Sequence, residues 1–307
     1  MALLRLIRFP NLCIVALTQW LLYDRVVVPA LVSQQITPQL SELECICYIA
    51  VTITLTASGY IINDIMDLPA DRINKPGRIL IDQRISRQTA SWFYLTLGLT
   101  GFMMTTYLGL VCERLHLIGL YPLAFILLYL YSSVLKHRPL AGNLLIALFC
   151  AGVAGAIWLA EEDALAQLSR QAPDIARPVQ FLLVWYIVFA FLSTLYRELV
   201  KDLEDQEGDR EVGSRTAPIM WGITSAKILA GISGGLLLVF LLWQSQFIYT
   251  YFPDWLVWFV GIGLVLPLIW TFFDLAFAKK KTQYHRISTV LKVVMLNGVL
   301  LLLFANL

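Results

Sequence analysis

The sequence predicts an all-α membrane protein, a bundle of about nine transmembrane helices in a single domain, 1–307. Of its 307 residues 59% are hydrophobic and only 14% are charged, and the mean hydropathy is +0.72. A soluble domain of this length would carry about a quarter charged residues. Two clusters of carboxylates, each after a long apolar stretch, interrupt this composition. Ionisable groups beside hydrocarbon are costly and usually functional, so these clusters mark the candidate site.

Nine apolar segments are long enough, at roughly 20 residues each, to cross a bilayer. We expect the spans at 9–31, 43–66, 89–111, 115–134, 141–160, 179–201, 224–246, 254–277 and 287–306. The first lacks a convincing signal-peptide cleavage site, so we retain it as a span. The stretch from Glu161 to Pro178 is acidic at its start and amphipathic, and we expect a surface helix there.

The distribution of basic residues predicts the orientation. With the amino terminus inside, only four of the 23 lysines and arginines fall outside: Arg25, Arg114, Arg170 and Arg177. The positive-inside rule therefore predicts that the amino terminus and both acidic clusters face the cytoplasm, in the cell membrane. The run 279–281 is then most simply an inside anchor. The net charge of +2 gives no reason to expect nucleic acid as a partner.

The second span ends in the first acidic cluster, Asn63-Asp64-Ile65-Met66-Asp67-Leu68-Pro69-Ala70-Asp71. Helical spacing places Asn63, Asp64 and Asp67 near one face. Pro69 cannot continue the helical ladder, so we expect the helix to end or restart just before it, with Asp71 on the following turn. The alternative, a solvated helix end, would leave the amide, the spacing and the second cluster as coincidences.

The second cluster runs from Asp202 to Asp209 after the sixth span. Asp202, Asp205 and Asp209 share a face if the helix continues, although Gly208 weakens that continuation. Each cluster ends an even-numbered span, so both lie at the same side of the membrane. We interpret them as two halves of one cation-binding site.

Clustered carboxylates with an amide form a hard-oxygen site suited to Mg²⁺. We expect the metal ligands to be Asn63, Asp64, Asp67, Asp71, Asp202, Asp205 and Asp209, with Asp67, Asp71, Asp205 and Asp209 catalytic. Mg²⁺ binds a few carboxylates together with substrate phosphates, so a diphosphate is the natural bridge between the clusters. Basic residues at the same level would neutralise the remaining phosphate charge: Arg8, Arg72, Lys75, Arg78, Lys136, Arg138 and Lys201. For Lys136 and Arg138, simple anchoring at the inside face is an equal alternative.

These features describe an enzyme for a lipid-linked diphosphate such as an isoprenyl diphosphate. Departing pyrophosphate would be stabilised, and a nucleophile would capture the allylic cation. The expected partners are a prenyl diphosphate, a lipophilic acceptor and membrane lipids, and the sequence leaves the oligomeric state open.

At these residues the chain resembles the UbiA-type intramembrane prenyltransferase superfamily. Its motif Asn-Asp-x-x-Asp-x-x-x-Asp is matched from Asn63 to Asp71, and its second motif at Asp205, Asp209 and Gly213. Arg8 and Asn11 look like the family's helix-1 pair, and Tyr131 and Lys136 like its helix-4 diphosphate contacts. The resemblance implies a helical bundle with a central cavity open laterally to lipid, Mg²⁺ dependence and prenyl transfer to a lipophilic acceptor. The run 78–82 departs from the usual Arg-Pro-x-Pro-Ser, which puts the conformation of that loop in doubt.

The run from Arg197 to Asp209 is most similar to the branch that alkylates geranylgeranylglyceryl phosphate. That similarity favours a prenylglycerol phosphate acceptor, and an aromatic acceptor of quinone-type biosynthesis is the alternative. A cation-coupled transporter is the alternative of another class. Transporter sites lie near the bilayer midplane on broken helices, whereas both clusters lie at the ends of spans. The signature of the CDP-alcohol phosphotransferases is absent from the sequence.

Overall fold

The computed structural model describes residues 1–74, 76–244 and 253–304, apart from the side chain of Arg78. Nine helices among them are long and apolar enough to cross a membrane: Phe9–Ser33, Glu42–Met66, Arg87–Val111, Leu115–Ser133, Ala141–Ala160, Pro173–Glu204, Ala217–Trp243, Asp254–Phe277 and Lys281–Phe304. The expected spans are confirmed, and the chain is an integral, multi-pass membrane protein. The expected ends at 245–246 and 305–306 lie outside the described residues.

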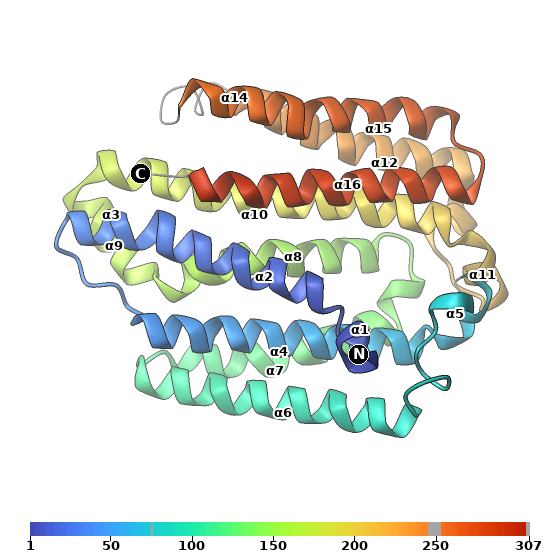
Figure 1. The fold of residues 1–307 in the computed structure, drawn as a ribbon, viewed down its shortest axis with the longest axis horizontal. Coiled ribbons are helices and arrows are strands. Elements are labelled where there is room, and N and C mark those ends of the chain that lie inside the picture. Colours follow the sequence, from blue (N-terminus) through green and yellow to red (C-terminus); the bar gives the residue numbers. More distant parts are fainter. Residues whose placement is uncertain (75, 245–252, 305–307) are drawn as a thin grey trace.

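Seven spans are built on one long helix each: α4 (Glu42–Met66), α6 (Arg87–Val111), α7 (Leu115–Ser133), α8 (Ala141–Ala160), α10 (Pro173–Glu204), α12 (Ala217–Trp243) and α16 (Lys281–Leu300, continued by η5, Leu301–Phe304). Their axes run along the long direction of the molecule (Figure 1). Helix α4 packs against α6 and α7, and α10 packs against α8, α12 and α16. Because α10 is surrounded by helices, side chains such as Leu183, Tyr196 and Val200 are fully buried.

The other two spans contain a wide π-helical turn. The first comprises α2 (Phe9–Leu21), η1 (Leu22–Val27) and α3 (Val28–Ser33), and the eighth comprises α14 (Asp254–Val260), η4 (Gly261–Val265) and α15 (Leu266–Phe277). Each π-helical turn ends two residues before a proline, Pro29 or Pro267. A proline ring clashes with the carbonyl four residues earlier in a regular α-helix, and a wider turn relieves that clash.

Three spans begin six or seven residues earlier than the sequence predicted, and one of them is α16, which starts at Lys281 rather than 287. Helix α10 starts at Pro173 rather than 179. The helix expected between Glu161 and Pro178 is therefore shorter than predicted and comprises α9 (Glu162–Gln171). Helix α12 starts at Ala217 rather than 224, but its backbone breaks at Gly222, where φ is +82°. Glycine adopts this conformation without steric cost. The continuous part of α12 therefore begins close to the predicted residue.

Two buried charged residues, Arg114 and Glu161, connect segments at the end of the bundle that carries α9. The buried guanidinium of Arg114 donates to Glu162 and Asp163, each at 2.6 Å. The fully buried carboxylate of Glu161 accepts from the backbone N–H groups of Gln39 and Leu40, at 2.8 and 2.9 Å. These contacts satisfy polar groups that burial would otherwise penalise.

The opposite end carries short helices, three of which are seen together in Figure 1: α1 (Ala2–Leu6), α5 (Leu68–Asn74) and α11 (Gln206–Glu211). We call it the acidic end, because α5 and α11 contain parts of the two carboxylate motifs. The helices meet at Gly208, where a Cβ atom would lie 2.5 Å from Asn74 Nδ2 and 2.7 Å from the carbonyl oxygen of Ala70. Only glycine allows this approach.

We predict that Gly208→Ala separates α5 from α11, because its methyl group meets backbone as well as a side chain. Overpacking of this kind costs about 1–3 kcal/mol. The melting temperature of the detergent-solubilised protein should fall. Gly231→Ala in α12 is the control, since nothing lies within 4 Å of the added methyl group. Equal melting temperatures for the two variants would contradict the close contact.

Candidate functional site

A cavity of about 1370 Å³ lies between α2, α4, α7, α8, α10 and α16. At the acidic end its wall includes the carboxylates of both motifs, and farther in it includes apolar side chains such as Val51, Leu55 and Leu128. Along α4 the lining extends from Asp64 to Tyr48, which is about 24 Å at a rise of 1.5 Å per residue. The cavity is therefore polar at one end and suited to a long hydrocarbon chain in its depth.

The first motif lies where α4 ends and α5 restarts. Asp67 terminates α4, and its carbonyl accepts from the N–H of Asp71 at 2.8 Å. This confirms the helix restart predicted from Pro69. The Asn63 amide donates to the Asp67 carboxylate at 2.7 Å, as their spacing predicts. Asn63, Asp64, Asp67 and Asp71 all line the cavity.

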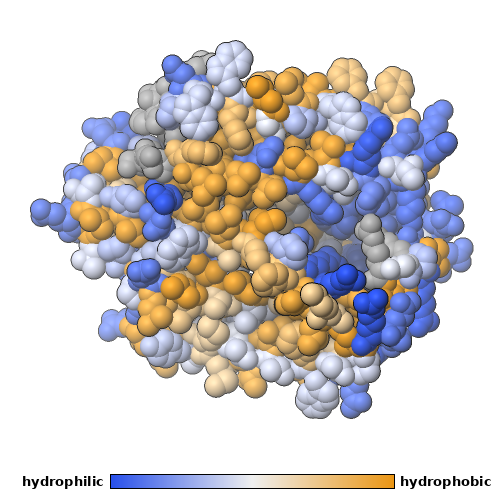
Figure 2. Space-filling view, viewed as in Figure 1, coloured by the Kyte–Doolittle hydropathy of each residue, from blue (hydrophilic) through white to orange (hydrophobic). Residues whose placement is uncertain are grey.

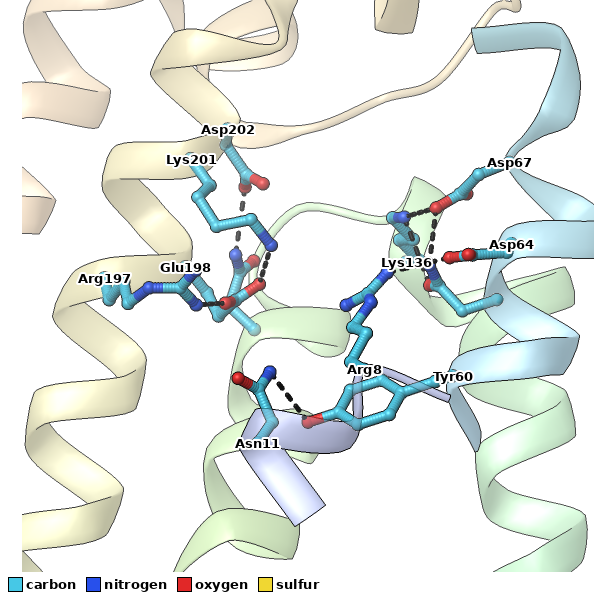
Figure 3. A network of polar contacts seen from close by, with 12 residues as sticks. Arg8, Asn11, Tyr60, Asp64, Asp67, Lys136, Arg197, Glu198, Lys201 and Asp202 are labelled. Carbon is cyan, nitrogen blue, oxygen red and sulfur yellow. Dashed lines mark hydrogen bonds and ion pairs between the residues drawn. The ribbon is translucent and has the colours of Figure 1, made fainter. Parts of the chain in front are cut away.

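Arg8 joins the start of α2 to the first motif. Its guanidinium donates to Asp64 at 2.8 Å and lies over the Tyr60 ring, 4.6 Å from the centroid. Asn11 donates to the Tyr60 hydroxyl at 3.3 Å (Figure 3). Burial lowers the pKa of Arg8 and the Asp64 charge raises it, with a net raised value. Arg8 has φ of +50°, a left-handed conformation that is uncommon for residues other than glycine.

Lys136 supplies a cation to the same carboxylates from η3 (Leu135–His137). Its ammonium donates to the Asp67 carboxylate and, at 3.2 Å, to the side-chain amide oxygen Oδ1 of Asn63. Burial is the largest single influence and lowers the pKa of Lys136, but the charge and hydrogen bond of Asp67, together with the charges of Tyr131 and Asp71, outweigh it and the pKa is raised. Tyr131, in the last turn of α7, is buried and lines the cavity beside them. The Lys136 ammonium therefore marks a position at which the carboxylate of Asp67 binds a positive charge.

The second motif faces the first across the cavity. The last turn of α10 carries Asp202, which accepts from the Asn143 amide at 3.0 Å. Asp205 follows α10 directly and Asp209 lies on α11, and both line the cavity. Figure 3 shows the α10 side chains on one side, Asp64 and Asp67 on the other, and Arg8 and Asn11 between them.

Glu198, one turn before Asp202, was missing from the predicted site. Its carboxylate accepts from Arg197 at 2.7 Å and from Lys201 at 2.8 Å, and all three line the cavity. Charged residues inside a span mark functional sites, and this signal was present in the sequence. Asn143 was also missed, because nothing local to it indicates that it meets Asp202.

Two basic residues of the predicted set, Arg72 and Arg138, do not line the cavity, and the side chains of two more, Lys75 and Arg78, are not described. Arg72 is exposed, pairs with Asp82 at 3.3 Å and does not line the cavity. Lys75 lies outside the described residues, and only the backbone of Arg78 is described, in η2 (Pro76–Arg78). Arg138 is likewise not among the lining residues, in agreement with the anchoring alternative.

The donor chemistry at the acidic end fits Mg²⁺. Among the described residues, no three His, Cys, Asp or Glu side chains lie close enough to hold a metal ion by themselves. Mg²⁺ does not require such a cage, since it keeps several waters and binds one or two carboxylates plus substrate phosphates. The carboxylates of the first motif on one wall and those of the second motif on the facing wall meet this requirement when a diphosphate lies between them.

The model of the UbiA prenyltransferase family matches residues 26–296. A digeranylgeranylglyceryl phosphate synthase of Methanopyrus kandleri is 35% identical over 56% of this chain and 56% of that protein. Proteins of the same name from Pyrococcus horikoshii and Thermococcus kodakarensis are 32% and 27% identical, over 69% and 82% of this chain and 65% and 81% of theirs. The matches with the first two thus span less than two thirds of those relatives' length.

Two solved structures have the same fold. One, from work on digeranylgeranylglyceryl phosphate synthase in membranes, has a TM-score of 0.64, with 23% identity over 99% of this chain and 98% of that one. The other is a UbiA homolog from Archaeoglobus fulgidus bound to GPP and Mg²⁺, with a TM-score of 0.56 and 14% identity over 98% and 99%. The predicted fold class, a helical bundle around a central cavity, is confirmed.

We predict that Lys136→Met increases the stabilisation of the substrate-free protein by Mg²⁺. Without the ammonium, Asp67 is left without its charged partner, which destabilises the protein by up to about 3 kcal/mol and favours a bound cation. Because the Lys136 pKa is raised above its ordinary 10.5, the ammonium keeps its charge at neutral pH and the pair contributes fully there, and this stabilisation is lost as the pH rises above 10.5 through the raised value.

The measurement is the shift in melting temperature on adding Mg²⁺ near pH 7. Arg286→Met is the matched control, because Arg286 pairs with Asp274 away from the cavity. A Mg²⁺ shift in Lys136→Met no larger than in the unmodified protein would contradict this interpretation.

Proposed function

The chain belongs to the UbiA prenyltransferase family, and we propose that it is a Mg²⁺-dependent intramembrane prenyltransferase, with its motifs in one transmembrane domain. It transfers an isoprenyl group from a prenyl diphosphate to the hydroxyl of a prenylglycerol phosphate. The acidic end faces the cytoplasm, as the distribution of basic residues indicates.

The observation that supports this proposal is the composition of the cavity wall. The carboxylates of the two motifs face each other at the acidic end, with Arg8 and Lys136 beside them, and the wall becomes apolar with depth. The diphosphate group of a prenyl diphosphate matches the polar end of the cavity, and its hydrocarbon chain matches the apolar part. The carboxylates would repel it without cations between them, whereas Mg²⁺ and the basic side chains offset that repulsion.

The protein's own residues would bind and orient the diphosphate. Lys136 and Arg8, which pair with Asp67 and Asp64 in the substrate-free state, would turn to phosphate oxygens when the carboxylates take up Mg²⁺. Bound Mg²⁺ neutralises charge on the pyrophosphate leaving group. The carbon–oxygen bond to the diphosphate breaks with its electron pair on pyrophosphate, the acceptor hydroxyl forms a new bond to that carbon, and its proton passes to the departing pyrophosphate.

The names of the relatives support a glycerophosphate acceptor. Arg197 and Lys201 on α10 both contact Glu198 in the substrate-free protein, and these two basic groups could contact the phosphate of such an acceptor. An aromatic acid of quinone-type biosynthesis is the remaining candidate and has one carboxylate where the glycerolipid has a phosphate.

A competition assay tests the proposal. Purified protein receives geranylgeranyl diphosphate with equal concentrations of geranylgeranylglyceryl phosphate and 4-hydroxybenzoate, with Mg²⁺ or with EDTA. We expect the prenylated glycerophosphate as the main product and no turnover in EDTA, because the ligands are hard oxygens. Exclusive prenylation of the aromatic ring would reverse the acceptor assignment, and full activity in EDTA would remove the metal from the proposal.

We predict that Asp67→Ala and Asp205→Ala each lower kcat at least 100-fold, since each removes charge that positions the metal at the developing pyrophosphate. Both variants should remain monodisperse in detergent. The control is Asp174→Ala, which removes an exposed carboxylate that pairs with the nearby Arg177. Near-normal turnover with either motif variant would show that its carboxylate is surface charge.

A further inference from the structure

Tyr60 is an uncharged residue beside the first motif, one turn before Asp64 on α4, and it lines the cavity. The next two residues, Ile61 and Ile62, are buried in a hydrophobic core cluster, whereas Tyr60 is only half-buried. Packing against neighbouring helices is the usual role of an aromatic side chain in a span. Packing explains Ile61 and Ile62, but it does not explain the polar contacts of Tyr60.

Two residues at the start of α2 contact this one side chain. The Arg8 guanidinium lies over the Tyr60 ring, 4.6 Å from its centroid, and the Asn11 amide donates to the Tyr60 hydroxyl at 3.3 Å (Figure 3). Arg8 is the N-cap residue of α2 and Asn11 follows three residues later, so both belong to the first turn. Tyr60 therefore attaches the beginning of α2 to α4 at the level of the first motif. Figure 2 shows that the face carrying α2 is hollowed among hydrophilic side chains near the acidic end.

Arg8 has two partners of different kinds. The Asp64 carboxylate accepts from it at 2.8 Å and is negatively charged, whereas the Tyr60 ring is neutral and attracts the guanidinium through its electron-rich face. The side chains of Arg8 and Asp64 are 41% and 23% exposed, so water weakens the attraction between their charges. The position of Arg8 therefore depends on the ring as well as on the carboxylate.

The two contacts respond differently to a cation at the first motif. A divalent cation beside Asp64 offsets the charge of that carboxylate and repels the guanidinium, so the ion pair weakens. Mg²⁺ takes oxygen ligands, and the face of the Tyr60 ring offers none, so its attraction for Arg8 remains. A planar guanidinium over a ring can keep its N–H donors available for phosphate oxygens. Tyr60 is thus the partner that Arg8 retains while its donors exchange a carboxylate for a phosphate.

We propose that Tyr60 is a positioning residue for the diphosphate: its ring retains Arg8 at the acidic end when Asp64 takes up the metal, and the guanidinium then donates to the diphosphate. This proposal rests on the proposed function and names the residue through which Arg8 acts. The Tyr60 hydroxyl has the smaller part, because its hydrogen bond with Asn11 joins neutral groups and is long.

The test measures the affinity of the substrate-free protein for inorganic pyrophosphate with Mg²⁺, from the rise in melting temperature with pyrophosphate concentration. We expect Tyr60→Leu and Tyr60→Met, which both lack the ring, to weaken binding about 3- to 30-fold, the range of a cation–π contact. Tyr60→Phe keeps the ring and should keep most of the affinity. The control is Tyr107→Leu, at an exposed tyrosine of α6 outside the cavity lining, which should bind pyrophosphate normally.

A double-mutant cycle separates this role from a structural one. If Tyr60 acts through Arg8, Tyr60→Leu has little further effect on pyrophosphate affinity in Arg8→Met protein, where the guanidinium is already absent. A ring that only supported helix packing would lower the affinity by the same factor in both backgrounds. In steady-state kinetics, Tyr60→Leu should raise KM for geranylgeranyl diphosphate and leave KM for the glycerophosphate acceptor unchanged.

The outcomes separate the two hypotheses. An unmodified protein that binds no pyrophosphate with Mg²⁺ overturns the proposed function and the Tyr60 assignment with it. An unmodified protein that binds pyrophosphate, together with full affinity in Tyr60→Leu and Tyr60→Met, overturns the Tyr60 assignment alone. Equal losses with and without the Arg8 guanidinium, or a loss in Tyr60→Phe as large as in Tyr60→Leu, would also overturn it.

Discussion

The carboxylates of the two motifs repel one another, and the contact between α5 and α11 holds them at one cavity despite that repulsion. Asn74 makes the contact specific: its amide donates to the Asp205 carbonyl at 2.9 Å and accepts from the Gly208 N–H at 3.0 Å. Lys281 adds an ammonium on the Asn74 carbonyl at 2.9 Å. The Asn74 amide thus connects α5 to α11 through bonds to the backbone of Asp205 and Gly208. The carboxylates of Asp71, Asp205 and Asp209 are not used in this contact and line the cavity.

The substrate-free site is stabilised by internal ion pairs that a substrate can replace. Arg8 and Lys136 pair with the first motif, while Arg197 and Lys201 pair with Glu198 beside the second. Breaking a buried pair is costly unless a new partner is supplied at once. A diphosphate with a divalent cation supplies partners for both signs of charge, whereas either one alone would leave some groups uncompensated. The arrangement therefore favours joint binding of metal and diphosphate.

The spans, the helix restart at Pro69 and the motif residues could be predicted from the sequence, because hydropathy, proline geometry and helical spacing are local properties. Contacts between distant segments could not. Asn74 and Gly208 are 134 positions apart, and neither differs locally from an ordinary loop residue. The contact of Asn143 with Asp202 was likewise not predictable from local sequence. The pairing of Arg72 with Asp82 depends on the conformation of the loop between them, which the sequence did not predict. Lys281, interpreted as a simple anchor, proves to have a specific partner.

The position of the site at the ends of helices, rather than at the bilayer midplane, follows from the chemistry. A diphosphate and Mg²⁺ are strongly hydrated, and moving them to the midplane would remove that hydration at high cost. The prenyl chain has the opposite preference. A cavity with carboxylates where α4 and α10 end, and apolar walls below them, satisfies both parts of one molecule without carrying a charge across the membrane. This separates the arrangement from that of a transporter, whose ion site must be reached from both sides.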